Sequence, residues 1–281
     1  MPHLVFGRGL GCRKDPVDNR DYPLTRIPPE LRAKLPATVD YTDKMTGVSD
    51  QGDEGTCVGF ATVDGMKEYQ ETKEWKKTIQ LSVRYVYSEA QKIDGYPDNE
   101  EGTDIRCAMK VLNVKGVPPQ SCWKYKPHQT DKACGNADDL AMTYRISRYV
   151  RLKTLAEMKE SLFVNGPFVA GVDVYESWMT VAVDRTGVIP MPKKGEELLG
   201  GHAICIVGYD DKKKRFKFKN SWSRSWGDDG YGYLLYTYMT KYGMDCWSGK
   251  DKLHDPEMVK AIMAISKGLI KDGSWKTESF G

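Results

Sequence analysis

Residues 200–222 read GGHAICIVGYDDKKKRFKFKNSW, which is two strand-like runs joined by a charged turn. The alternation of residue types on both sides of the polar stretch 210–214 predicts a β-hairpin. If the turn is centred on Asp211, then His202 and Asn220 each stand nine residues from the centre. We therefore expect these two side chains to lie opposite each other in a regular antiparallel pair.

An apolar face accompanies this pair, because even-numbered residues of both strands point the same way. The predicted register pairs Ile204 with Phe218 and Ile206 with Phe216, and it turns Lys217 and Lys219 toward water. An amide oxygen beside a histidine fixes the ring and its tautomer, so the second ring nitrogen is aimed at another group. A histidine that only satisfies a buried strand end would give the same pattern, so the pair indicates catalysis only if a nucleophile lies nearby.

The candidate nucleophile is Cys57, which follows the stretch QGDEGT at 51–56 and begins an apolar, helix-like run. A helix N-terminus favours thiolate over thiol. Glycines at 52 and 55 let a substrate backbone approach closely. The Gln51 amide and the Cys57 N–H could stabilise an oxyanion. The alternative is that Cys57 is one more small buried residue, as most free cysteines are.

The remaining pattern changes from helical to strand-like along the chain. Helices are expected to start at Ser82, at Asp104 and, through a capping box, at Thr154. Residues 168–175, 203–209 and 215–219 alternate as strands do, and 256–271 are helical again. Helices in the first half and strands in the second predict an α+β fold with two lobes.

Composition narrows the classes of function. The 281 residues include 42 Lys+Arg and 39 Asp+Glu, a net charge of only +3 without a basic stripe, so we expect no nucleic-acid partner. No apolar run is long enough to span a bilayer, and residues 1–11 lack the apolar core of a secretory signal. With four histidines and no C-x-x-C pair, no metal site and no cofactor are expected. Of seven cysteines, Cys122 and Cys134 are the favoured disulfide, since both lie in one polar, loop-like stretch.

Three motifs in this order resemble the papain family of cysteine peptidases (the C1 family), in a microbial-type member. They are Gln51-Gly52-x-x-Gly55-x-Cys57, then Gly201-His202-Ala203 with Val207-Gly208-Tyr209, and then Lys219-Asn220-Ser221-Trp222-x-x-x-Trp226-Gly227. The resemblance covers roughly residues 37–250. It implies the papain-like two-lobe fold, with a helical left lobe, an antiparallel β right lobe and the active site in the cleft between them.

The resemblance also implies the chemistry. Cys57 would attack a peptide or protein substrate and form a thioester acyl-enzyme, His202 would act as general base and acid, and Asn220 would orient His202. Gln51 and the Cys57 N–H would hold the oxyanion, and Trp222 would shield the Asn–His contact. With no occluding insertion apparent, we expect an endopeptidase.

Several positions depart from the family pattern. Glu54 and Glu89 stand where the family often has two bridging cysteines, which slightly favours a cytoplasmic location. Val58 replaces the usual tryptophan after the nucleophile. Further substrate-binding residues are carried over from the family: Gly102, Thr103, Ile105, Gly171 and Ala203. The small or apolar nature of the last three predicts a preference for a bulky apolar residue two positions before the cleaved bond.

The two ends of the chain lie outside the family pattern. Residues 1–36 are rich in proline and polar turns and are too short for the family's helical pro-domain. A disordered tail would have the same composition, and the functional alternative is a short pro-segment; we expect this extension to lie in or near the cleft and to restrain activity. Cys12 within it is expected to be a free, exposed thiol, with pairing to an active-site thiol as the alternative. Residues 37–250 form the predicted peptidase domain, and 251–281 a helical tail.

Two other functions use the same residues. An acyltransferase would replace water with an amine at the acyl-enzyme, and it needs the same triad. A non-catalytic binding protein on a peptidase fold is the third possibility, and the presence of Cys57, His202, Asn220 and Gln51 argues against it.

Overall fold

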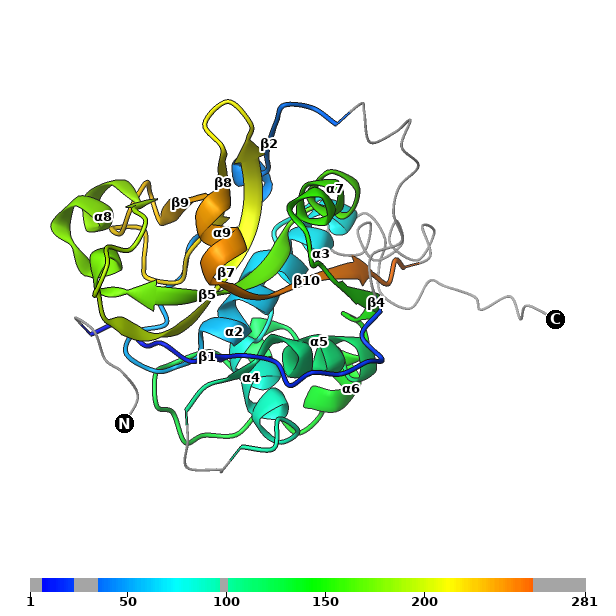
Figure 1. The fold of residues 1–281 in the computed structure, drawn as a ribbon. Coiled ribbons are helices and arrows are strands. Elements are labelled where there is room, and N and C mark those ends of the chain that lie inside the picture. Colours follow the sequence, from blue (N-terminus) through cyan, green and yellow to red (C-terminus); the bar gives the residue numbers. More distant parts are fainter. Residues whose placement is uncertain (1–6, 23–34, 97–100, 255–281) are drawn as a thin grey trace.

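The computed structural model describes residues 7–22, 35–96 and 101–254, and within them the chain forms two lobes (Figure 1). One lobe is helical and the other is built on an eight-stranded, mostly antiparallel sheet with the strand order β4-β10-β5-β7-β8-β9-β6, with β2 paired to β7. Two separate groups of buried apolar residues form the cores of the lobes. The α+β two-lobe prediction is confirmed.

The elements have the following bounds. The helical lobe contains α2 (Cys57–Gly59), the π-helical η2 (Phe60–Lys67), α3 (Glu68–Trp75), α4 (Val83–Gln91), α5 (Ile105–Val114), η3 (Gln120–Cys122) and α6 (Ala137–Ala141). The sheet consists of β2 (Thr38–Asp40), β4 (Ile146–Arg151), β5 (Phe168–Tyr175), β6 (Val188–Ile189), β7 (Leu198–Asp210), β8 (Arg215–Lys219), β9 (Tyr231–Leu235) and β10 (Gly243–Asp251). Around it lie η1 (Thr42–Lys44), α7 (Leu155–Asn165), η4 (Glu176–Met179), α8 (Val181–Thr186) and α9 (Tyr236–Tyr242), and β1 (Cys12–Arg13) pairs with β3 (Thr103–Asp104).

Side-chain caps start the helices where the sequence predicts them. Ser82 accepts a hydrogen bond from the Tyr85 N–H, and Asp104 accepts one from the Cys107 N–H. Thr154 and Glu157 form the predicted capping box of α7. These caps satisfy backbone donors that have no partner within the first helical turn, so the local sequence alone determines these starts.

Helices α2, η2 and α3 run on continuously from Cys57 to Trp75 and pack against the sheet. Gly65 allows the closest approach, because a Cβ at this position would overlap the Cβ of Cys205 on β7. Ala203, Cys205 and Val207 of β7 belong to the core of the helical lobe. The long helix therefore joins the two lobes, and its N-terminus lies at their boundary.

The β7–β8 hairpin forms, but its register differs from the predicted one. Asp210 pairs with Arg215, so the turn is centred between Lys212 and Lys213 and not on Asp211, and a bulge between Ile206 and Gly208 then leaves Ile206 opposite Phe218. The prediction that His202 and Asn220 lie directly opposite is therefore wrong, because it placed the centre of the turn too early and assumed a ladder without a bulge. The shared apolar face is confirmed, because the even-numbered apolar residues of both strands lie in the core of the sheet lobe.

Lys219 also differs from the prediction. It is 3% exposed, and its ammonium group contacts Asp64 at 3.1 Å and donates to Thr46 Oγ1 at 3.0 Å. The second face of the hairpin is covered by the helical lobe, so the lysine is buried with a counterion instead of facing water.

The predicted Cys122–Cys134 disulfide is present and closes a loop with a sequence separation of 12. The other five cysteines are free. Cys12 was predicted to be exposed, but it is buried. The predicted helix at 256–271 lies outside the described residues. In the described part of the chain, none of the helices combines the length and apolar character needed to cross a membrane.

Candidate active site

His202 on β7 and Asn220 just after β8 come together despite the shifted register. His202 Nε2 lies 2.8 Å from Asn220 Oδ1, and the ring stacks on Trp222 with centroids 4.6 Å apart. The His202 side chain is fully buried, and its Nδ1 has no hydrogen-bond partner among the described residues. One ring nitrogen is therefore fixed by the amide, and the other remains available for a further group.

Cys57 lies at the N-terminus of α2, close to Ala203, the residue of β7 that follows His202. The backbone N–H groups of Ala203 and Gly11 reach its sulfur, as do those of Val58 and Cys57 itself. Burial raises the pKa of the Cys57 thiol, although these N–H groups act to lower it. Burial lowers the pKa of His202 to about 4, against the opposing hydrogen bond to Asn220. In this closed arrangement burial therefore favours the uncharged forms of both groups, the Cys57 thiol and the neutral His202 imidazole.

The Gln51 side chain is fixed by three contacts. Its Oε1 accepts a hydrogen bond from Ser221 Oγ at 2.6 Å, and its Nε2 donates to the carbonyl oxygens of Glu54 at 2.8 Å and Gly9 at 3.1 Å. The Gln51 N–H also donates to the Ser221 carbonyl at 2.9 Å. The loop before Cys57 is thereby attached to the segment that carries Asn220.

The segment of residues 7–22, which contains β1, runs beside α2 and between the sheet and helices α4 and α5 (Figure 1). The Gly9 N–H donates to Gly52 O at 3.1 Å, and the Thr103 N–H donates to Gly11 O at 2.9 Å. Strand β1 continues this contact by pairing in parallel with β3. Glycine is required at both 9 and 11, because a Cβ there would overlap the carbonyl oxygens of Glu54 and Gly55.

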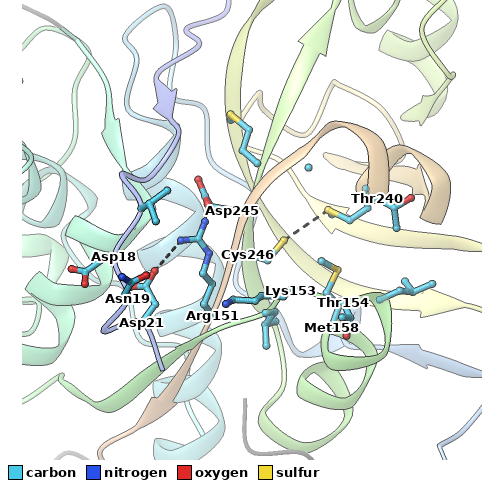
Figure 2. Close-up of a pocket in the computed structure, with 16 residues that line it drawn as sticks. Asp18, Asn19, Asp21, Arg151, Lys153, Thr154, Met158, Thr240, Asp245 and Cys246 are labelled. Carbon is cyan, nitrogen blue, oxygen red and sulfur yellow. Dashed lines mark hydrogen bonds and ion pairs between the residues drawn. The ribbon is translucent and has the colours of Figure 1, made fainter. Parts of the chain in front are cut away.

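Acidic residues anchor the extension further along. The Asp15 carboxylate accepts hydrogen bonds from Trp247 Nε1 at 2.6 Å and from the Arg106 N–H at 3.1 Å, and the Asp15 N–H donates to Asp245. Asp21 forms ion pairs with Arg106 and Arg151, each at 2.9 Å. Figure 2 shows Arg151 with Asp21 and Asp245 at the edge of a pocket of about 720 Å³ that contains none of the predicted catalytic residues.

The predicted substrate-binding residues lie around the extension. A Cβ at Gly171 would come 3.0 Å from Cys12 Sγ and 3.3 Å from both Ile105 Cδ1 and Met244 Cε, so these groups share one small apolar space. Ala203 pairs with Gly171 across β5 and β7. A Cβ at Gly102 would overlap the Gly11 carbonyl, and Thr103 binds that carbonyl. Met244 was missed by the sequence analysis, because β10 reaches this space only through the sheet.

Glu54 and Glu89 are not partners, although both occupy positions of expected bridging cysteines. Glu54 binds Arg84, whereas Glu89 forms ion pairs with Lys92 and Lys115. Arg84 carries no motif signal, so sequence reasoning did not select it.

Glu71, Glu74 and His254 offer ligand atoms that lie within 4.8 Å of one another. Protein groups already occupy these atoms, because Glu71 pairs with Lys67 and Trp75, and His254 bonds to Glu74 and to the Thr143 carbonyl. These three side chains therefore have a structural role, because their ligand atoms are bonded to other protein groups.

Comparisons with known proteins identify the family of this chain. The family model for papain family cysteine proteases matches residues 35–246. An uncharacterized peptidase C1-like protein of Acanthamoeba polyphaga mimivirus is 30% identical in an alignment of 274 positions that covers 88% of this chain and 88% of that protein. Mouse cathepsin S is 31% identical over 206 residues, which cover 70% of this chain and 58% of that protein.

The solved structures give the same result. The cysteine protease xylellain from Xylella fastidiosa superimposes with a TM-score of 0.79 at 32% identity, covering 87% of this chain and 96% of that chain. A procathepsin B of Trypanosoma congolense, with a TM-score of 0.71 and 20% identity, shares the fold. This chain belongs to the papain family of cysteine proteases and is a cysteine peptidase.

Proposed function

We propose that Cys57, His202, Asn220 and Gln51 carry out peptide hydrolysis, and that residues 7–22, here called the arm, restrain it. The observation that supports this most strongly is the arrangement of His202, which has Asn220 on one ring nitrogen and no hydrogen-bond partner among the described residues on the other, while the N–H of the next residue, Ala203, reaches the Cys57 sulfur. Such a base–nucleophile pair, with the base oriented by a third group, fits acyl transfer.

The steps follow from these positions. The Cys57 thiol transfers its proton to His202 Nδ1 as the sulfur attacks the carbonyl carbon of the substrate. The negative charge that develops on the oxygen is stabilised by Gln51 Nε2 and the Cys57 N–H. The C–N bond then breaks, the leaving amine takes the proton from His202, and a thioester remains on Cys57. Water attacks this thioester with His202 as base, which releases the acid and restores the thiol.

The arm occupies the cleft in an unproductive way. Attack requires one carbonyl group that lies at both the sulfur and the oxyanion donors. In the arm, the group at the sulfur is the Gly11 N–H, whereas the carbonyl that binds Gln51 belongs to Gly9. No single arm peptide bond meets both requirements, so the arm blocks substrate and is not itself positioned for cleavage.

Release of the arm also changes the chemistry at the pair. Burial is the main cause of the raised pKa of Cys57 and of the lowered pKa of His202. Water that enters the opened cleft reduces this effect on both groups. We therefore expect the open form to favour the reactive thiolate–imidazolium pair.

The full chain can test both parts of the proposal with the substitution Gly11→Val. The added side chain cannot fit against the Gly55 carbonyl, so the arm is expelled while every residue of the cleft is kept. Val17→Ala is the matched arm control, because Val17 is 95% exposed. With a fluorogenic peptide that has leucine two positions before the cleaved bond, we expect at least about tenfold faster hydrolysis by Gly11→Val than by wild type.

The two parts fail in different ways. Equal rates for wild type and Gly11→Val would contradict restraint by the arm. No hydrolysis by a folded Gly11→Val protein, or hydrolysis that persists after Cys57→Ala is added, would contradict the proposed catalytic role of Cys57.

A further inference from the structure

A buried ion pair lies immediately behind the loop that precedes Cys57. Arg84 on α4 makes two parallel hydrogen bonds to the Glu54 carboxylate, at 2.6 and 2.5 Å, and the two side chains are 5% and 7% exposed. The His128 N–H donates to the same carboxylate at 2.9 Å, and the Tyr125 hydroxyl oxygen lies 3.2 Å from it. Oε1 accepts from Arg84, and Oε2 accepts from both Arg84 and the His128 N–H, which holds the Glu54 side chain in one position.

The backbone of Glu54 is in turn a contact of the proposed oxyanion donor. An amide NH₂ has two hydrogens, and one Gln51 hydrogen is taken by the Glu54 carbonyl at 2.8 Å. Because Ser221 holds the amide oxygen, the plane of the amide is fixed. The second hydrogen then has a single direction, and in the closed form it meets the Gly9 carbonyl.

The same cluster holds the other end of the loop. Tyr125 OH donates to the Gln51 carbonyl at 2.7 Å and lies 2.9 Å from Thr56 Oγ1. The Arg84 guanidinium stacks over the Tyr125 ring at 4.8 Å and donates to the Lys126 carbonyl at 2.7 Å. Arg84 thus connects the loop to the 125–128 segment through directed polar contacts.

We propose that the Glu54–Arg84 pair is a positioning device for the reaction: it fixes the Glu54 carbonyl, and this carbonyl sets the direction of the Gln51 N–H that stabilises the oxyanion. The inference rests on the proposed function, and it adds two residues that do not touch substrate. Glu54 stands where a disulfide cysteine was expected from the family pattern, so an ion pair performs the bracing here.

The test uses the full chain in the arm-released Gly11→Val form. Glu54→Gln and Arg84→Met break the pair, and Arg84→Lys keeps the charge but loses the two-pronged contact. The matched control is Glu89→Gln, which removes another ion-paired glutamate of similar burial that has no contact with the loop. Each protein is assayed for peptide hydrolysis and for alkylation of Cys57 by iodoacetamide.

The two reactions separate positioning from general damage. Alkylation needs the thiolate but develops no oxyanion, whereas hydrolysis needs both. Since loss of one oxyanion donor lowers kcat about 10²–10³-fold, a misdirected donor should lower kcat roughly 10–100-fold, with KM and the alkylation rate changed less than about twofold. Arg84→Lys should recover part of the loss, and Glu89→Gln should match the parent.

A double substitution gives the decisive outcome. If Glu54 acts through Gln51, then adding Glu54→Gln to Gln51→Ala lowers kcat little further, because the donor is already absent. Additive losses, unchanged kcat in Glu54→Gln, or alkylation that falls in parallel with kcat would each overturn the inference. A parent that does not hydrolyse the peptide contradicts the proposed function, and this is seen before any Glu54 variant is compared.

Discussion

Acid should tighten the docking of the arm, because Asp15 is a residue of the arm and its carboxyl group is buried when the arm is docked. Burial raises the pKa of Asp15 from 3.8 to about 6, although the hydrogen bonds from Trp247 and the Arg106 backbone oppose this. When the arm leaves, Asp15 returns to water and to its ordinary pKa. Between these two pKa values the docked arm binds a proton that the released arm does not, so docking becomes more favourable as pH falls through this window.

The magnitude follows from the two pKa values. The full effect, between high and low pH, is at most roughly 3 kcal/mol at about 1.4 kcal/mol per pKa unit. From pH 7 to pH 5 the gain is about 1.3 kcal/mol, which makes docking about tenfold tighter. The group is 4% exposed, so solvent screening reduces this only modestly.

The assay compares wild type with Asp15→Asn, which is permanently uncharged at this position. Cys57 reacts with iodoacetamide only when the arm is open, so the alkylation rate, read at Cys57 by peptide mass spectrometry, reports the open fraction. The intrinsic pH dependence of the thiolate is the same in both proteins and cancels in the ratio of wild type to Asp15→Asn. We expect this ratio to fall about tenfold from pH 7 to pH 5.

A ratio that stays constant, or rises as pH falls, would refute this reasoning. It would mean either that the Asp15 carboxyl is not desolvated by docking or that the arm does not control access to Cys57. Val17→Ala, an exposed arm position, should follow wild type throughout.

Three further outcomes are expected. Asn220→Ala, in the arm-released form, removes the 2.8 Å contact to His202. A hydrogen bond to a group that becomes charged contributes about 1.5–3 kcal/mol, so kcat/KM should fall roughly 10–150-fold. An unchanged kcat/KM would contradict the orienting role of Asn220. Gly171→Val fills the small apolar space, so peptide-library profiling should show preference moving from bulky to small residues by about tenfold; an unaltered profile would place that subsite elsewhere. Replacing Cys122 and Cys134 by serine should lower the free energy of unfolding by about 2–4 kcal/mol in urea titrations, while no loss would mean that the loop is held by packing alone.

Features that depend on neighbouring residues were predicted well. The helix starts at Ser82, Asp104 and Thr154 each follow from a side chain that caps a donor three residues on. The same reasoning predicted the helix at Cys57, because an apolar run after a glycine-rich turn is local information. The Cys122–Cys134 disulfide could be predicted because both residues lie in one short segment of the sequence.

Features that depend on how elements pack were predicted less well. The partner of Ile206 is Phe218 and not Phe216, because the turn is centred between Lys212 and Lys213 and a bulge follows in β7, and nothing in the alternation of the strands marks either feature. Lys219 follows a polar pattern, yet the long helix covers its face of the sheet and pairs it with Asp64. A pattern of period two shows that two faces differ, but it does not show what covers each face.

By itself, the sequence determined the lobes, the order of the motifs and the residue types that belong at a nucleophile, its base and its oxyanion donor, since these are encoded by short-range pattern and chemistry. Only the tertiary structure showed that the arm packs closely against the loop of residues 51–56 at Gly9 and Gly11. It alone also showed that Arg84 forms an ion pair with Glu54 of this loop. These contacts join residues 30 or more positions apart, and their geometry depends on the packing of whole elements, which no local pattern specifies.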